Sequence, residues 1–516
     1  MRRQPDACGC EAGHEPKNPS PQVAHLPIGE PLAGMPPIQE IIHSLEQGAG
    51  RRWLLLAVTL VCFLGIGVVM DTKFARNMTT PEGMEAAQLA RNIAEGKGYT
   101  TGVLRPLSIR LIQNVEKPAS PLLKESSLPD LHNPPLYPVL LAGWLKLNPF
   151  GYRISEDGSF RLYGPDIWVA IFNQLLLGTA AFLTYRLATR MFDQTAGWLS
   201  AGIFASTWLF WQLTFTGHSS VLLMVLSLSL AHCLFRAGDA SLGEDPSGAR
   251  IIRWGIMAGA CVGLMALTRY SAAWVIIPVA LYLAFLINRT PGMEWSGPSL
   301  DVASLGKLAS SRLVSAAGAV AVFLLLFGPW VVRNYQVAGA PFGAAGHAIY
   351  MGTEQFPGDA VERLLYPDFS AFDYHEVRRK VINNLRYILF GDLTRFAGGW
   401  MVLFFLVGLL IPYRRGVLNR FRWFLVLTLG FMVLAMAGGR TPLSDNRDTA
   451  DISSENLIAP FSPLIFIYGV GLLLTLVDQM RVGHPMRGRL IQGGAALLCS
   501  LPMLMAFFPP LPYVTP

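Results

Sequence analysis

The sequence predicts an all-α polytopic membrane protein. Of its 516 residues, 52% are hydrophobic and only 15% are charged, and the mean hydropathy is +0.40. Such a composition leaves too little polar surface to cover a soluble domain. Apolar runs of about 18–20 residues, enough to cross roughly 30 Å of hydrocarbon, recur along the chain. We therefore expect a bundle of about eleven transmembrane helices, with further helices at the outer membrane surface.

The segment 1–50 differs in composition from the rest of the chain. Eight prolines lie within its first 40 residues, and a polar segment of this kind buries too little to order itself. We expect a disordered cytoplasmic tail. Cys8, Cys10 and His14 lie in it, and three candidate ligands in such a tail are weak evidence for a metal site. Because the first apolar run starts far from residue 1, we expect it to remain as a span rather than to be removed as a signal peptide.

The apolar runs define the spans, and the charges of the short loops define their orientation. The predicted spans are 53–70, 166–188, 196–213, 219–236, 253–268, 272–288, 312–331, 397–413, 422–437, 457–477 and 490–508. With the amino terminus inside, the arginines of the short loops fall on the cytoplasmic face, as the positive-inside rule requires. The long segments 71–165, 332–396 and 438–456 then lie on the outer face.

This topology divides the chain after its tail into three parts. Residues 51–331 form an N-terminal transmembrane module, 332–396 a second outer loop, and 397–516 a set of C-terminal transmembrane helices. The apolar run 134–147 is short for a crossing, and counting it as one would invert the later loops. We keep it on the outer face as an interfacial or re-entrant helix.

Two polar segments of the outer loops predict surface helices. In the first, Thr80 suits the N-cap, Pro81 the first turn, and glycines at 96 and 98 the end. An apolar stripe and an acid-bearing stripe share this helix, so it either caps the bundle or holds an acid over it. The second, at 375–388, has a positive face that can meet lipid phosphates. The segment 438–456 is rich in acids and turn formers and predicts a mobile loop on the acceptor side.

Several motifs follow each other in an order typical of one family. They are "ARNIAEGKGY", "HNPPLYPVLLAGWLKL", "TYRLATRMFDQTAGWLSAGIFAST", "GLMALTRYSAAWVIIPVAL" and "GPWVVRNYQVAGAPFG". Over residues 53–475 the chain resembles the C-type (GT-C) membrane glycosyltransferases. Within them it is most similar to the bacterial branch related to protein O-mannosyltransferases and lipid A aminoarabinose transferases (families 39 and 83).

The resemblance implies transfer of a sugar from a polyprenyl-phosphate donor to an acceptor on the outer face. A carboxylate near the membrane takes the acceptor's proton, and cations stabilise the departing phosphate. Relatives carry an Asp where this chain has Pro81, so we consider Glu82 first, then Glu85, then Asp71 as the base. Because this Asp is missing, the chain could instead be a non-catalytic relative of these enzymes.

Candidates for binding the donor phosphate stand at the outer ends of the spans. They are Arg269, Arg333, Asn334, His132 and Asn133. An arginine fork can donate two hydrogen bonds to a phosphate, although a membrane-edge arginine can also simply extend to the interface. Lys97, Arg105 and Arg110 are looser candidates that we expect to be solvated.

We predict no metal and no other cofactor. Relatives commonly have a second acid in the short outer loop after the third span, whereas this chain has His218 there. That histidine can bind a phosphate or a metal, and we expect it in a solvated loop. No nucleotide-binding motif is present, and nothing indicates a nucleic-acid partner.

The sequence thus predicts an integral-membrane glycosyltransferase of the bacterial inner membrane, with a periplasmic active face. Its partners are the lipid bilayer, a polyprenyl-phosphate sugar, and a glycan, lipid or protein acceptor of the cell envelope. The alternative is a transporter or flippase for a lipid-linked saccharide. The near absence of charges in the middle of the spans favours chemistry at one face over transport.

Overall fold

The computed structural model describes residues 49–75, 77–115, 128–152, 163–242, 246–287, 302–369, 373–393, 399–413, 415–439, 456–479 and 485–508. The tail, with Cys8, Cys10 and His14, and the acidic loop at 440–455 lie outside these residues. The described chain is mostly helical. Its one sheet is an antiparallel pair of two-residue strands, in which Thr100 of β1 (Thr100–Thr101) lies opposite Pro129 of β2 (Leu128–Pro129). The predicted all-α fold is confirmed, while the division into modules stays a prediction.

Eight helices of the described residues are long and apolar enough to cross a membrane. They are α2 (Ala49–Val69) continued by η1 (Met70–Phe74), α7 (Gly164–Met191), α10 (Ser220–Leu242), α11 (Gly248–Thr268), α13 (Val302–Ala338), α18 (Gly416–Gly439), α19 (Ser462–Gln479) preceded by η7 (Ala459–Phe461), and α20 (Pro485–Phe507). Each coincides with a predicted span. The polytopic membrane fold is confirmed.

The other three predicted spans are divided or shortened. The expectation of one continuous helix over 196–213 is wrong, because α8 (Gln194–Ala205) ends before α9 (Trp208–Phe215) begins. At the break the Thr207 hydroxyl donates to the carbonyl of Ile203 at 2.8 Å, a side-chain bond that competes with the helical backbone bonds. The span at 272–288 is built from η2 (Tyr270–Val275), α12 (Ile276–Leu281) and η3 (Tyr282–Leu286), and the described part of 397–413 contains α17 (Met401–Leu410).

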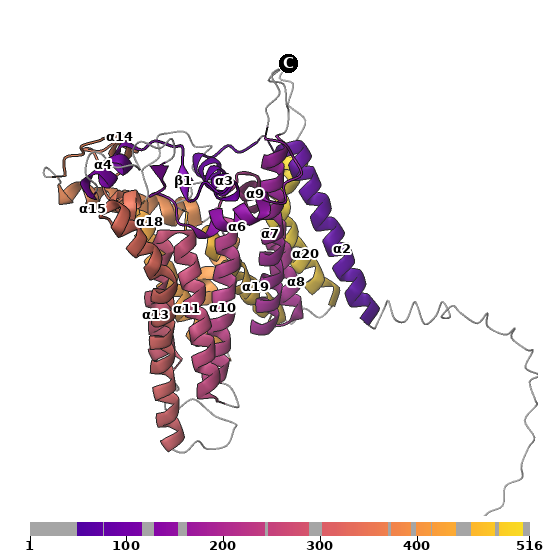
Figure 1. Ribbon diagram of the computed structural model, residues 1–516. Helices are drawn as coiled ribbons and strands as arrows, with labels where there is room; N and C mark the ends of the chain where they lie inside the picture. Colours follow the sequence, from indigo (N-terminus) through magenta and orange to yellow (C-terminus); the bar gives the residue numbers. More distant parts are fainter. Residues whose placement is uncertain are drawn as a thin grey trace, which may run out of the picture. The chain divides into compact units, whose positions relative to one another are not determined.

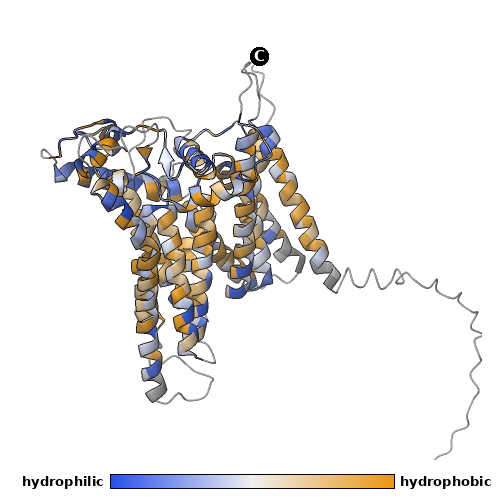
Figure 2. Ribbon diagram, viewed as in Figure 1, coloured by the Kyte–Doolittle hydropathy of each residue, from blue (hydrophilic) through white to orange (hydrophobic). Residues whose placement is uncertain are grey.

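A layer of short helices lies at one end of the bundle (Figure 1). It includes α3 (Pro81–Ala94), α4 (Pro106–Val115), α6 (Leu136–Leu145), η4 (Gly343–His347), α14 (Ala360–Arg363) and α15 (Tyr374–Tyr387) continued by η5 (Ile388–Asp392). Figure 2 shows the layer as a mixture of hydrophilic and hydrophobic residues above largely hydrophobic helices. The predicted helices at 81–95 and 375–388 are present. With 10 residues, α6 is about 15 Å long, half of what a crossing needs, in agreement with its expected interfacial place.

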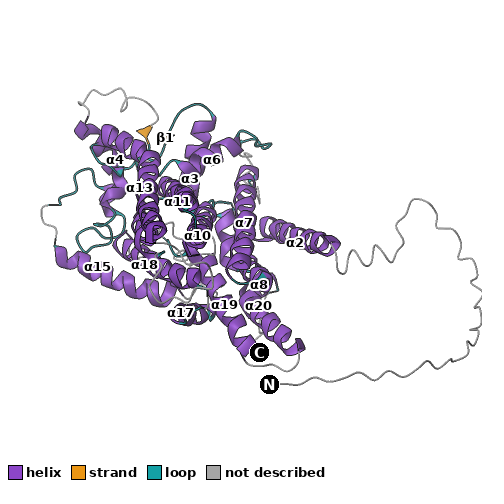
Figure 3. Ribbon diagram, turned by 90° about the horizontal axis from the view of Figure 1, so that it is seen from below, coloured by secondary structure: helices purple, strands orange, loops and turns teal. Residues whose placement is uncertain are grey.

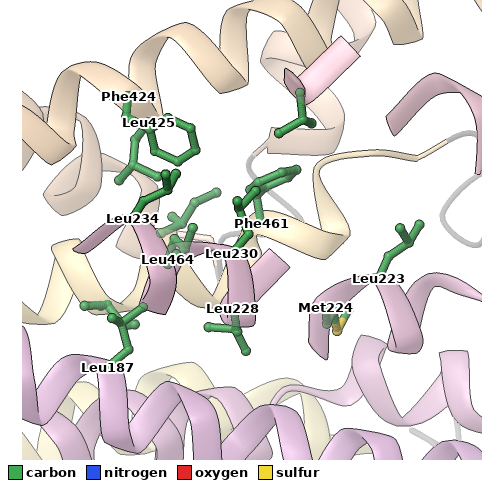
Figure 4. Packing of buried hydrophobic residues seen from close by; sticks show 14 of the residues in the cluster. Leu187, Leu223, Met224, Leu228, Leu230, Leu234, Phe424, Leu425, Phe461 and Leu464 are labelled. Carbon is green, nitrogen blue, oxygen red and sulfur yellow. The ribbon is translucent and has the colours of Figure 1, made fainter. Parts of the chain in front are cut away.

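The core of the bundle forms around α10. In the view of Figure 3, α10 lies among α7, α11, α18 and α19, and it packs against all four. Figure 4 shows Leu230 and Leu234 of α10 in one cluster with Leu464 of α19 and Phe424 of α18, all buried. Small residues let neighbouring backbones approach: a Cβ on Gly259 of α11 would lie 2.2 Å from the carbonyl oxygen of Ala319 in α13.

Candidate functional site

A pocket of about 210 Å³ opens where the layer of short helices meets the ends of α10, α11 and α18. Its polar and charged lining includes Glu82, His132, Asn133, His218, Arg269 and Glu362. These residues come from segments far apart in the sequence: α3, the turn before α6, the start of α10, the end of α11, and α14. Four of the eight residues predicted as site residues, Glu82, His132, Asn133 and Arg269, therefore line the same pocket.

Glu82 is fixed by the start of α3. The Thr80 hydroxyl caps this helix by accepting from the N–H of Gly83 at 3.4 Å, and it donates to the carbonyl of Thr216 at 2.9 Å. Gly83 permits an even closer approach, because a Cβ there would lie only 2.0 Å from the Thr216 carbonyl oxygen. The first turn of α3 thus rests on the backbone just after α9. This contact places Glu82 at the pocket wall.

Glu85, one turn further along α3, lies outside the pocket lining. Arg105 Nη2 donates to its Oε1 at 2.6 Å and to its Oε2 at 2.8 Å. Asn133 Nδ2 donates to Oε2 at 3.3 Å. Both charged side chains are mostly buried, at 11% and 14% exposure. Glu85 is therefore engaged in a structural ion pair, and Arg105 is not solvated as the sequence suggested.

Glu362 of α14, which the sequence did not single out, extends this ion pair to the pocket. Its Oε2 accepts from Arg105 Nε at 2.8 Å, and its Oε1 lies 3.0 Å from Nδ1 of His132. We call Glu85, Arg105, Glu362 and His132 the rim network, since they form one chain of alternating charge along the pocket edge. The network joins α3, the segments before α4 and α6, and α14.

The rim network favours the charged form of both its pocket members. Burial opposes the charge of Glu362, but the hydrogen bond with His132, the charge of His132 and then that of Arg105 lower the pKa of Glu362 to about 2. Burial likewise opposes the charge of His132, but the hydrogen bond with Glu362 and its negative charge raise the pKa of His132 above its ordinary value. The two therefore form an imidazolium–carboxylate pair.

Arg269 lines the pocket directly after the end of α11. Its Nη2 lies 3.4 Å from the hydroxyl oxygens of both Ser219 and Ser220, at the start of α10. His218 lies beside these serines and also lines the pocket. With 1% exposure, it is buried and not in a solvated loop as expected from the sequence.

Arg333 and Asn334 are not part of the pocket lining. Arg333 Nη1 donates to the carbonyl of Asp130 at 2.8 Å and to Asn334 Oδ1 at 2.9 Å. The buried Asp130 carboxylate in turn accepts from the N–H of Asn133 at 2.8 Å, and burial raises the pKa of Asp130. These two candidates thus support the turn that carries His132 and Asn133.

Asp71 lies in η1, and its carboxylate accepts from Gln174 Nε2 at 2.7 Å. It does not line the pocket with the other candidates. In the part of the chain that the structure describes, no group of three or more His, Cys, Asp or Glu side chains is placed to hold a metal ion. The expectation of no metal stays a prediction.

The fold and the pocket define a polytopic helical membrane protein in which two carboxylates, an arginine and two histidines line one cavity. Cationic side chains can bind a phosphate, and a carboxylate beside it can accept a proton. Residues 149–306 match the family model of dolichyl-phosphate-mannose-protein mannosyltransferases, a stretch that includes His218 and Arg269. Over this stretch the predicted resemblance to the C-type membrane glycosyltransferases is confirmed. No curated protein sequence matches the chain.

Solved structures of membrane transferases resemble the chain at low sequence identity. ArnT from Cupriavidus metallidurans, bound to undecaprenyl phosphate, is 15% identical, with 89% of this chain and 64% of ArnT covered and a TM-score of 0.49. The Archaeoglobus fulgidus oligosaccharyltransferase in its apo form is 14% identical, with 88% and 54% covered and a TM-score of 0.42. The archaeal oligosaccharyltransferase AglB from the same organism, in complex with an inhibitory peptide and a dolichol-phosphate, is 14% identical. The match covers 89% of this chain and 55% of AglB, with a TM-score of 0.42. The chain spans less than two thirds of the length of these proteins.

Proposed function

We propose that the chain is an integral-membrane glycosyltransferase that moves a sugar from a polyprenyl-phosphate donor to an acceptor of the cell envelope. The observation that carries this proposal is the pocket, which collects Glu82, Arg269 and His132 from three distant segments. The description of the matching family, whose donor is a dolichyl-phosphate mannose, supports the same class of donor. We place the protein in a bacterial inner membrane with the pocket on the periplasmic face.

In this reaction the acceptor hydroxyl attacks the anomeric carbon of the donor sugar. Its oxygen forms the new glycosidic bond, its proton passes to Glu82, and the bond between the anomeric carbon and the phosphate oxygen breaks. The polyprenyl phosphate leaves with the bonding electrons, and Arg269 and protonated His132 stabilise the negative charge that it gains. Glu82 fits the role of base because it lines the pocket, whereas Glu85 lies outside the lining in an ion pair with Arg105.

The test is sugar transfer in membranes that contain the full chain and labelled polyprenyl-phosphate sugars. We expect Glu82→Gln to lower transfer about 10²–10⁴-fold, the usual contribution of a general base. The matched control is Glu95→Gln, which changes an exposed carboxylate at the other end of the same helix, paired with Arg91 and Lys97. It should leave the rate unchanged.

Two results would contradict the proposal. Full transfer by Glu82→Gln would show that Glu82 is not the base, and Asp71 or Glu85 would then be the candidates. No transfer by the intact chain with any donor would favour a transporter of lipid-linked saccharides or a non-catalytic relative.

A further inference from the structure

We propose that Glu362 is a positioning residue that keeps His132 protonated, so that the pocket binds the donor phosphate at pH values where an ordinary histidine is neutral. This inference rests on the proposed function, because it takes the lipid phosphate as the ligand of the pocket. It assigns a role in the site to the second outer loop, which contributes Glu362 through the short helix α14.

The argument starts from the orientation of the imidazole ring. Nδ1 of His132 lies 3.0 Å from Glu362 Oε1. A carboxylate oxygen and a ring-nitrogen lone pair would repel each other at this distance, so Nδ1 carries a proton. The ring therefore titrates at Nε2, and the ring belongs to the pocket lining. In the neutral ring Nε2 presents a lone pair, which repels a phosphate oxygen. In the imidazolium it presents an N–H, which donates to one.

Other charges around His132 do not by themselves keep it protonated. Arg105 lies on the same carboxylate and opposes a second positive charge, while Asp130 favours it from behind the turn. Glu82, His218 and Arg269 share the pocket lining with the ring. Among the described residues Glu362 is the carboxylate in an ion pair with it, and the contact with and charge of Glu362 are the main factors that raise the pKa of His132 against the effect of burial.

Glu362 is well suited to hold this charge permanently. Arg105 Nε donates to the other carboxylate oxygen of Glu362, Oε2, at 2.8 Å, and this contact holds the carboxylate in place. Only 14% of the Glu362 side chain is exposed, so water and salt screen its charge weakly. The low pKa of Glu362 keeps the carboxylate ionised throughout the physiological range. The positive charge at the pocket edge therefore depends on a residue that is distant in sequence and does not itself need to touch the ligand.

The experiment measures equilibrium binding of undecaprenyl phosphate to the purified full chain in nanodiscs, from about pH 5.5 to about pH 9, a range that brackets the ordinary histidine pKa. We expect binding by the wild type to persist above the ordinary histidine pKa. In Glu362→Gln the midpoint of the binding profile should move toward acid by about 1–3 pH units, the usual effect of one close opposite charge.

Two further variants separate a shifted titration from damage to the fold. Glu354→Gln is the matched control, because Glu354 lies on the same loop but pairs with Arg379 at an exposed site. It should reproduce the wild-type profile. His132→Lys carries a charge that does not titrate in this range, so it should remove the pH-dependent step in the wild-type background and restore binding in the Glu362→Gln background.

The outcomes distinguish failure of the role of Glu362 from failure of the proposed function. A Glu362→Gln profile that superimposes on the wild type, or a His132→Lys change that restores nothing, overturns the role of Glu362 while donor binding stands. Absence of undecaprenyl phosphate binding by the wild type at every pH overturns the proposed function and this inference together.

Discussion

At the scale of single residues, Arg105 holds two buried carboxylates of different helices. It contacts Glu85 at 2.6 Å and Glu362 at 2.8 Å. Arg105→Ala would leave both acids buried without their cation, and breaking a buried pair in this way costs about 3–5 kcal/mol. We expect a clear fall of the thermal unfolding midpoint, measured on the purified protein in detergent.

The control for Arg105 is Arg379, which pairs with Glu354 at an exposed site. Exposed ion pairs contribute about 0–1 kcal/mol, so Arg379→Ala should hardly change the unfolding midpoint. Equal effects of the two substitutions would show that the rim network is not the stabilising element that its burial indicates.

The sequence predicted part of the pocket, but it did not predict the rim network. Glu82, His132 and Arg269 were candidates from the sequence, and the structure brings them into one pocket lining, while their roles stay a prediction. Glu85 shares the acid-bearing stripe of its helix with Glu82, and periodicity alone does not show that Arg105 binds it. Glu362 lies in a four-residue helix without a motif, among the charged neighbours Asp359 and Arg363, so nothing in the sequence set it apart.

At the scale of elements, the position of α3 depends on Gly83. Gly83→Ala would bring a methyl group to 2.0 Å from a backbone oxygen that a rotamer change cannot move. The helix would have to shift, and with it Glu82, at a cost of about 1–3 kcal/mol for overpacking. We expect a loss of sugar transfer together with a lower unfolding midpoint.

Gly143 of α6 provides the comparison, because an added Cβ there meets nothing within 4 Å. Gly143→Ala should keep full transfer and raise helix stability by up to about 1 kcal/mol. If Gly83→Ala also kept full transfer, the close contact between α3 and Thr216 would not be what positions the base.

The elements themselves were mostly predictable, and the exceptions have local causes. Apolar length predicted the eight long helices, and the Thr80 cap and apolar stripe predicted α3. Hydropathy could not detect the break between α8 and α9, because Ser206 and Thr207 end the helix through hydrogen bonds of their hydroxyls to Ile203 and not through loss of apolar character.

At the scale of the whole molecule, the pair of His132 and Glu362 predicts how stability depends on pH. The pKa of Glu362 is lowered to about 2 from 4.5, so its contribution is complete above about pH 4.5 and is lost as the pH falls toward 2. The pKa of His132 is raised from 6.5, so its contribution is complete below 6.5 and is lost as the pH rises through the raised value.

We therefore expect the difference in unfolding midpoint between wild type and Glu362→Gln to be largest between about pH 4.5 and 6.5 and to shrink on both sides. Thermal unfolding of both proteins over a pH series measures it, and taking the difference cancels the titration of other groups. A difference that stays constant over the series would contradict an ion pair between these residues.

The most direct test of the central claim is a cryo-electron microscopy structure of the full chain with undecaprenyl phosphate. We predict density for the phosphate in the pocket lined by Glu82, within hydrogen-bond distance of Arg269 and His132, with the lipid chain leading from it toward the bundle. A phosphate bound elsewhere, with the pocket empty, would contradict the account.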